Sequence, residues 1–185
     1  MSIIITTSLT LEKNMRKITL LLSLLLLIGT IGGCGGKKRV NLNPGVPQNI
    51  AVLTLDGNLA GQTEDQKREL DIVMRWMDRD IISSLKRSGL NAVLIKDKKN
   101  YSKNMGKLLI VDVDAFNPGS RAARAFVGYG AGASSLGLDY SLHGEDGKNL
   151  LAWKDSVGSS KGGTYCAQTL NRNATEKVVV FLNNN

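Results

Sequence analysis

Two arginines three residues apart, Arg121 and Arg124, are the side chains of this sequence best suited to bind an anion. If Ser120 caps a short helix, these two residues lie on one face of it. Guanidinium groups in that position suit carboxylate or phosphate partners. They could pair with Asp112 or Asp114 and lock the adjacent turn, which is the preferred interpretation. Alternatively, they could hold an anionic lipid headgroup, a glycan or a protein loop.

Three alternating glycines, Gly128, Gly130 and Gly132, follow these arginines. Glycine lets the backbone approach a ligand closely or adopt unusual dihedral angles, so the stretch is a possible binding loop together with the arginines. A dinucleotide-binding loop is disfavoured, because that motif follows a strand and opens a helix, whereas here a helical segment precedes the glycines and a strand follows. The small residues could also pack between subunits, although packing beneath the sheet of one chain is preferred.

Asp112 and Asp114 project from one face of an expected strand, because alternate residues of a strand share a face. They could share a divalent cation with Asp139 or Glu145. A solvated strand face, or ion pairs with the two arginines, is the preferred interpretation. The sequence therefore predicts no metal site and no cofactor.

The possible nucleophiles and bases do not form a catalytic pattern. His143 is the only histidine and falls in an expected turn, with no obvious partner to orient its ring. Cys166 is predicted to be a small buried residue rather than an intermolecular bridge or a nucleophile. We therefore predict no catalytic residues and expect a protein that is not an enzyme.

The elements that position these residues follow from apolar periodicity. A buried strand is expected at 50–55, and a helix at 64–88 begins after the capping residue Thr63 and ends at Gly89. Further strands are expected at 92–95, 108–116, 136–142 and 150–157, and a closing helix at 165–182. This order predicts an α+β fold, with a mixed or mostly antiparallel sheet of about five strands and a long N-terminal helix and a C-terminal helix packed on it.

The N-terminal segment indicates export. Met15-Arg16-Lys17 precedes an apolar run at 18–31, which is too short for a comfortable membrane span of roughly 20 residues. Ile31-Gly32-Gly33-Cys34 resembles the lipobox of bacterial lipoproteins, which implies that Cys34 is acylated and becomes the new N-terminus. The expected organisation is a lipoprotein signal peptide at 1–33 with Met15 as its true start, a lipidated flexible tether at 34–48, and a single α+β globular domain at 49–185.

The net charge of the chain is +8, of which +6 remains after removal of a leader with three basic residues and one acidic residue. Part of the excess lies in Lys37-Lys38-Arg39, beside the expected lipid, and part around Lys96–Lys99. Nucleic acid is not an expected partner, because no recognition-helix motif, zinc knuckle or aromatic–basic interleaving is present. By analogy with lipoprotein sorting, Gly35 after the acylated cysteine favours the outer membrane, facing the periplasm.

The stretch Phe116–Gly132, which reads FNPGSRAARAFVGYGAG, together with the lipobox resembles the bacterial lipoprotein family with domain of unknown function 4410. The resemblance covers roughly 49–182 and implies a fold and a cell-envelope location, with no assigned activity. The expected function is a membrane-anchored, non-catalytic accessory or scaffold domain that binds an envelope protein. The alternative is a binder of an anionic small ligand or lipid headgroup through Arg121, Arg124 and the glycine-rich loop. The oligomeric state stays open.

Overall fold

A computed structural model of the 185-residue chain describes residues 40–45, 48–57, 59, 61–120 and 132–185. These residues belong to one compact unit, Arg39–Asn185. The described elements, in chain order, are β1 (Asn49–Leu55), α2 (Glu64–Arg87), β2 (Asn91–Ile95), the 3₁₀ turns η1 (Lys98–Asn100) and η2 (Lys103–Met105), β3 (Lys107–Asn117), β4 (Ser134–His143), β5 (Asn149–Ser159) and α4 (Gly163–Asn183). Among these residues, no helix combines the length and the apolar character needed to cross a membrane.

The five strands form one mixed sheet in the order β2-β1-β3-β4-β5. β1 pairs with β2 and β3 in parallel, and β3-β4-β5 is an antiparallel meander. The α+β prediction is therefore confirmed, with each strand within two residues of its expected limits. The expected turn at 144–147 joins β4 to β5. His143 lies at the end of β4 rather than in that turn, because its backbone continues the ladder opposite Leu108.

Helix α2 has the limits that its local signals predict. The hydroxyl of Thr63 accepts a hydrogen bond from the backbone amide of Gln66, and the Gln66 side chain accepts one from the amide of Thr63. This reciprocal capping satisfies amides that a helix N-terminus otherwise leaves without partners. Gly89 stops the helix with a φ of 95°, a conformation that strongly favours glycine.

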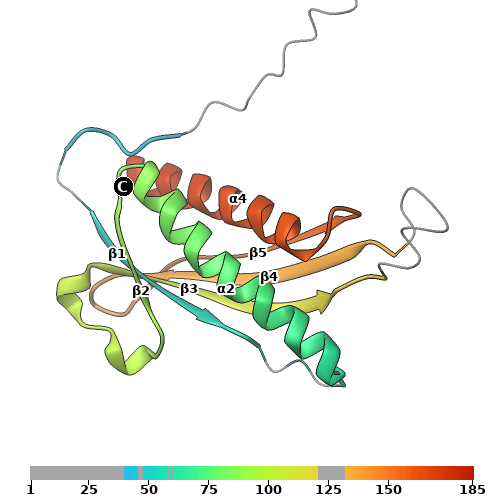
Figure 1. Ribbon diagram of the computed structural model, residues 1–185. Coiled ribbons are helices and arrows are strands. Elements are labelled where there is room, and N and C mark those ends of the chain that lie inside the picture. The colour runs from blue at the N-terminus through green and yellow to red at the C-terminus, as the bar shows by residue number, and fades with distance from the viewer. Residues whose placement is uncertain (1–39, 46–47, 58, 60, 121–131) are drawn as a thin grey trace, which may run out of the picture. The chain divides into compact units, whose positions relative to one another are not determined.

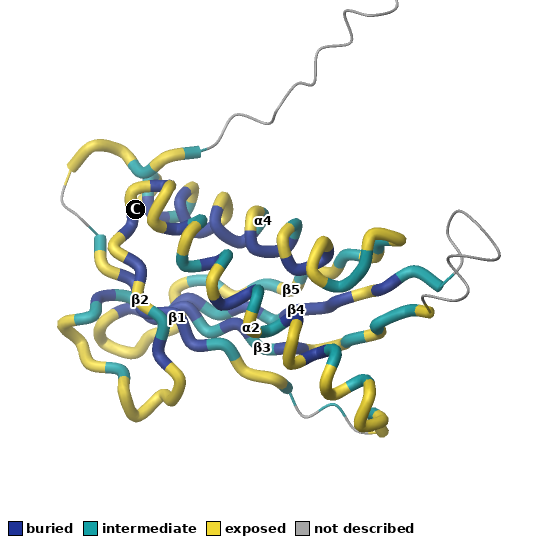
Figure 2. Tube along the Cα trace, in the orientation of Figure 1, coloured by how far each residue is buried: buried dark blue, intermediate teal, exposed yellow. Residues whose placement is uncertain are grey.

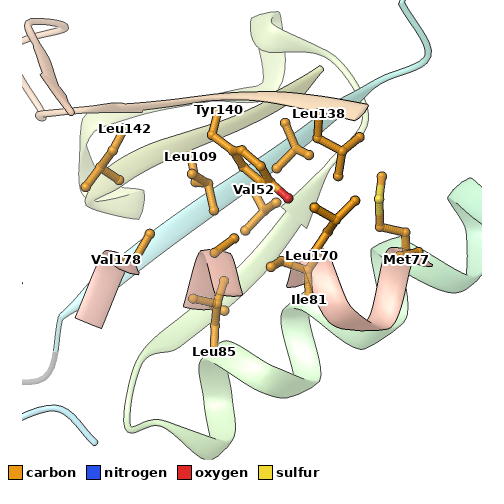
Figure 3. Packing of buried hydrophobic residues seen from close by; sticks show 14 of the residues in the cluster. Val52, Met77, Ile81, Leu85, Leu109, Leu138, Tyr140, Leu142, Leu170 and Val178 are labelled. Carbon is orange, nitrogen blue, oxygen red and sulfur yellow. The ribbon is translucent and has the colours of Figure 1, made fainter. Parts of the chain in front are cut away.

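Both helices cover the same face of the sheet (Figure 1). Figure 3 shows sheet residues such as Val52, Leu109 and Leu138 facing Ile81 of α2 and Leu170 of α4. Alternate strand residues supply this layer, as the expected period of two requires. The apolar stripe of α2 is also as expected, except that buried Asp78 lies within it, where it accepts hydrogen bonds from Thr54 and Lys96.

The other face of the sheet is covered only in part. The connection from β2 to β3, residues 96–106, crosses this face and is called the strap below. Tyr101 and Met105 of the strap pack on a small apolar cluster formed by Ala51, Leu53, Ile95 and Leu108. Beyond the strap, the face that carries Asp112, Asp139 and Lys154 is open.

Strand directions give the domain two distinct ends. At one, the tether end, β1 and β3 begin, the β4–β5 turn lies and α4 terminates. At the other, the loop end, β3 and β5 terminate and both helices begin (Figure 1). The ends matter because the N-terminal segment reaches the first, whereas the stretch that resembles the lipoprotein family joins β3 to β4 at the second.

The segment that precedes β1 contacts the tether end. The amide of Leu42 donates to the carbonyl of Ser88 at 2.8 Å. The Asn183 side chain accepts from the Asn43 amide at 2.9 Å and donates to the Asn41 carbonyl at 3.0 Å. Val40 and Leu42 also pack against the main core. Residues 40–43, which the sequence assigned to the flexible tether, therefore bind the ends of α2 and α4.

The hydroxyl of Tyr140 allows a test of the core packing. Tyr140 stacks on Trp153 with ring centroids 4.6 Å apart, and its buried hydroxyl has no hydrogen-bond partner among the described residues. We expect Tyr140→Phe to keep the stack and to increase the free energy of unfolding by up to about 1 kcal/mol, because it removes an unsatisfied polar group. Chemical denaturation of the full-length protein in detergent measures this change.

Tyr101→Phe is the matched control. The Tyr101 hydroxyl donates to the carbonyl of Gly106 at 2.6 Å, so its removal should lower the free energy of unfolding by about 1 kcal/mol. A loss of stability in Tyr140→Phe equal to that in the control would contradict the assignment of an unsatisfied hydroxyl.

Candidate functional site

The residues singled out in the sequence fall partly inside the described structure. Arg121, Arg124, Gly128 and Gly130 lie outside the described residues, as does Cys34. Gly132 is described, and so are all residues at the base of the loop between β3 and β4. The candidate site is therefore built from that base and from what surrounds it.

The two ends of the β3–β4 loop are joined to each other. The amide of Ser120 donates to the carbonyl of Gly132 at 3.0 Å, and the Ser134 hydroxyl donates to the carbonyl of Pro118 at 2.5 Å. The Asn117 side chain accepts from the Gly119 amide at 2.8 Å, as an Asx turn does. This hydrogen-bonded base fixes the points from which the loop leaves and re-enters the sheet.

A cavity of about 750 Å³ lies beside the loop base. Its walls come from the first turns of α2, the start of α4 and the loop base, and include Arg68, Glu69, Ile72, Pro118, Ser134, Lys161, Gly162 and Thr164. Thus three parts of the chain that are distant in sequence meet at the loop end.

The lining of the cavity combines charge with apolar surface. Helix α4 begins there after Gly162, which provides no side-chain cap, and Lys161 lies next to it. Backbone amides at a helix N-terminus attract negative charge. Arg68 forms an ion pair with Asp65, while Ile72 is 50% exposed. Such a lining suits a short acidic and apolar segment of a partner or a small anion.

The described lining contains no arrangement for nucleophilic catalysis. Cys166 lies close by but is fully buried, and its thiol donates a long hydrogen bond of 3.6 Å to the carbonyl of Ser134. Burial raises the pKa of the Cys166 thiol, which disfavours the reactive thiolate. The prediction that Cys166 is a buried small residue is confirmed.

The open face of the sheet carries a second polar cluster. Asp112 and Asp139 are opposite each other on β3 and β4, and Lys154 of β5 contacts Asp139 at 2.7 Å and Asp114 at 3.6 Å. One oxygen of Asp112 and one of Asp139 are buried without a hydrogen-bond partner among the described residues. Among those residues no group of three or more ligands is arranged to hold a metal ion.

Burial and the neighbouring carboxylate control the charge of this pair. Desolvation, followed by repulsion from Asp139, raises the pKa of the Asp112 carboxyl, and amide hydrogen bonds from Val113 and Gly57 only partly oppose this. The hydrogen bond to Asp139 raises the pKa of Lys154. His143 is on the same face, where its Nε2 lies 3.0 Å from the Ser141 hydroxyl and its Nδ1 lies 3.3 Å from the carbonyl oxygen of Gly147.

Two features of the open face and of the cavity were not predicted from the sequence. Lys154 contacts Asp114 and Asp139, which was not anticipated, while Arg121 and Arg124, the expected partners of Asp112 and Asp114, lie outside the described residues. The contribution of Lys161 and Gly162 to a cavity was also not anticipated, since residues 159–163 were expected to form only a connecting loop. The Gly162-Gly163 pair just before an apolar-periodic helix was the one signal for it.

Comparison with known proteins gives a family and solved structures of low similarity. The family model described as "Domain of unknown function (DUF4410)" matches residues 42–162. The search of curated proteins found no match. Among solved structures, the PelC dodecamer from Paraburkholderia phytofirmans is 13% identical, with a TM-score of 0.47 over 77% of this chain and 94% of that chain. A putative neuraminyllactose-binding hemagglutinin homolog from Helicobacter pylori is 12% identical, with a TM-score of 0.36 over 80% of this chain and 89% of that chain.

The Asp112–Asp139 pair predicts a specific pH dependence. A folded-state pKa above the unfolded value adds stability at low pH that is lost as the pH rises through the folded-state pKa. Asp112→Asn mimics the protonated form, so at about pH 7 it should raise Tm by a few degrees, and this gain should disappear near pH 4. Thermal unfolding of the full-length protein in detergent, followed across this range, measures the effect.

Asp114→Asn serves as the control for this prediction. Its side chain is on the same face but 53% exposed and close to Lys154. It should therefore give no gain in Tm at neutral pH. Equal pH profiles for Asp112→Asn and the unmodified protein would show that the carboxylate pair does not have the assigned titration.

The loop base can be tested at Gly119, whose φ is 70°. A Cβ atom at this position would lie 2.2 Å from the carbonyl oxygen of Gly132, so the two ends of the loop would have to separate. We expect Gly119→Ala to lower the free energy of unfolding by about 3 kcal/mol and to speed hydrogen exchange of the Ser120 amide.

Gly147→Ala separates backbone strain from steric overlap. Gly147 has a φ of 81°, yet no atom lies within 4 Å of its hypothetical Cβ. This control should cost about 1 kcal/mol and leave exchange at Ser120 unchanged. If both alanine variants behaved alike, the close contact at the loop base would have no energetic role.

Proposed function

The chain belongs to the family described as Domain of unknown function (DUF4410), and we propose, from the resemblance of Ile31–Cys34 to a lipobox, that it is a non-catalytic accessory lipoprotein of the bacterial envelope. In this proposal Cys34 carries the lipid, and the loop end binds a protein partner. The observation that carries the proposal is the placement of residues 40–43 and of the β3–β4 loop base at opposite ends of the domain.

The contacts of residues 40–43 favour a short tether. Because Leu42 and Asn43 are bound to the ends of α2 and α4, the free chain after an acylated Cys34 ends at about Val40. That stretch spans at most about 20 Å when fully extended. An acyl anchor at Cys34 would therefore hold the tether end close to the bilayer, with the loop end directed away from it. Two or more acyl chains give stable anchoring.

The loop end has the properties expected of a protein-binding surface. Three of the exposed large apolar side chains, Leu55, Ile72 and Tyr165, belong to segments at or beside this end. Ile72 also lines the cavity. Apolar groups beside charged ones are typical of interfaces between proteins, and the cavity wall that carries Ile72 also carries Arg68 and Lys161. The outer membrane, facing the periplasm, is the proposed location, from the lipobox and Gly35.

A second candidate function is binding of a small anion or lipid headgroup in the cavity. The start of α4, Lys161 and the loop that carries Arg121 and Arg124 are adjacent to this space or leave from its wall. Titration of the full-length protein with inorganic phosphate tests this candidate. Saturable binding that Lys161→Gln weakens supports it, and binding that this change leaves intact argues against it.

The main proposal predicts where a partner can be cross-linked. A photoreactive amino acid replaces Ile72 in one variant and Val180 in the other, two apolar residues that are 50% and 42% exposed. In the native host, the Ile72 position should give a cross-linked envelope protein, whereas Val180, on the last turns of α4, should give little. Mass spectrometry of the N-terminal peptide reports whether Cys34 is acylated.

Two results would contradict this proposal. One is an N-terminal peptide that begins at either methionine, with an unmodified Cys34. The other is cross-linking of the same partner with equal yield from Ile72 and Val180. Cys34→Ser should release the protein from membranes washed without detergent, or leave the leader uncleaved.

A further inference from the structure

The strap is the most strongly basic described segment of the domain. Residues 96–106 contain four lysines and a single acid, Asp97. Lys96 is engaged with Asp78 at 2.5 Å, but Lys98, Lys99 and Lys103 are exposed and form no ion pair within the described part of the chain. Asp97 instead caps η1 by accepting a hydrogen bond from the Lys99 amide. The strap therefore presents three ammonium groups to solvent.

These lysines are held on a fixed frame. The Tyr101 hydroxyl donates to Gly106, and Tyr101 and Met105 pack on the apolar cluster of the sheet. The two 3₁₀ turns give the backbone a defined course between these points. Most of the strap is exposed (Figure 2), and its exposed residues are all polar or charged, whereas Tyr101 and Met105 are partly buried against the sheet. A partner would be attracted by charge rather than by inserted apolar groups.

The strap reaches the tether end of the domain. Gly106 packs on the backbone of Asn49, the first residue of β1. Burial raises the pKa of Tyr101, and the charge of Glu145 in the β4–β5 turn raises it further. In Figure 1 the strap extends on the side of the view where α4 ends. The other acid of the turn, Asp146, is paired with Lys148 at 3.1 Å. Glu145 is therefore the main opposing charge.

From this arrangement we infer that the strap is an electrostatic docking surface for the anionic headgroups of a phospholipid bilayer. The inference rests on the proposed lipid anchor at Cys34, which would hold the tether end within about 20 Å of the membrane. Electrostatic attraction falls off within about 10 Å, so only basic residues on that end can contribute. Each lysine at an anionic surface increases binding by about fivefold.

The test uses the full acylated chain in lipid nanodiscs that contain either phosphatidylglycerol or phosphatidylcholine alone. Lysine acetylation is followed by mass spectrometry. Lys98, Lys99 and Lys103 should react several-fold more slowly in the phosphatidylglycerol discs, and high salt should abolish the difference. Lys67 and Lys161, at the loop end, should react equally in both kinds of disc.

A charge-matched pair of variants shows whether the strap lysines cause the contact with the anionic bilayer. In the strap variant Lys98, Lys99 and Lys103 become glutamine, and in the control variant Lys67, Arg75 and Arg172, which are exposed on α2 and α4, become glutamine. A fluorophore on Asn104→Cys, in η2, should be quenched by quencher-labelled headgroups in phosphatidylglycerol discs. The strap variant should lose most of this quenching, while the control keeps it. Equal quenching in both variants, or equal acetylation in both kinds of disc, would overturn the inference.

Different results would refute the proposed acylation of Cys34 and the inferred membrane contact of the strap. An unmodified Cys34 in the N-terminal peptide refutes the anchor. The same full-length chain is then sedimented with phosphatidylglycerol vesicles. Binding of headgroups by the strap is refuted if the strap variant sediments with the vesicles as well as the control variant does. Slow acetylation of the strap lysines in native membranes, but not in phosphatidylglycerol discs, would identify an acidic protein surface instead and would also overturn the inference.

Discussion

The order of the three parallel strands constrains the rest of this domain. β1 lies between β2 and β3, so the connection from β1 to β2 and the one from β2 to β3 run in opposite directions across the sheet. Since such crossovers are right-handed, they must lie on opposite faces. Helix α2 takes one face and the strap takes the other. The buried helical face and the lysine-bearing strap are therefore two consequences of one strand order.

The sequence predicted those parts whose determinants are local. The limits of α2 follow from Thr63 and Gly89, which act within one helical turn, and the β4–β5 hairpin follows from its turn residues. The run Val178–Phe181 could have formed a strand, and tertiary burial decides for a helix, because Val178 and Val179 are fully buried against the sheet. The strand propensity of these four residues does not outweigh the burial of the apolar face of the whole helix α4.

The remaining features depend on partners that are distant in sequence. Asn183 binds the backbone of Asn41 and Asn43, about 140 positions away, and nothing local to either segment indicates that pairing. The contact of Lys154 with Asp139 depends on the β4–β5 register, which shifts at a bulge near His143. The same holds for the cavity, since α2, the β3–β4 loop base and the start of α4 meet there only after folding.

The charges on the open face make it a poor surface for association, which favours the two ends of the domain as the proposed binding surfaces. An uncovered apolar sheet face would invite non-specific association, and a row of mixed charges discourages it. Here Lys154 lies between Asp114 and Asp139, and Asp112 keeps a partly buried carboxyl beside them. Desolvation of these groups by a partner would cost free energy without new ion pairs to offset it. The loop end, with exposed Ile72 and Tyr165, and the strap, with lysines that have no ion pairs in the described structure, carry no such penalty.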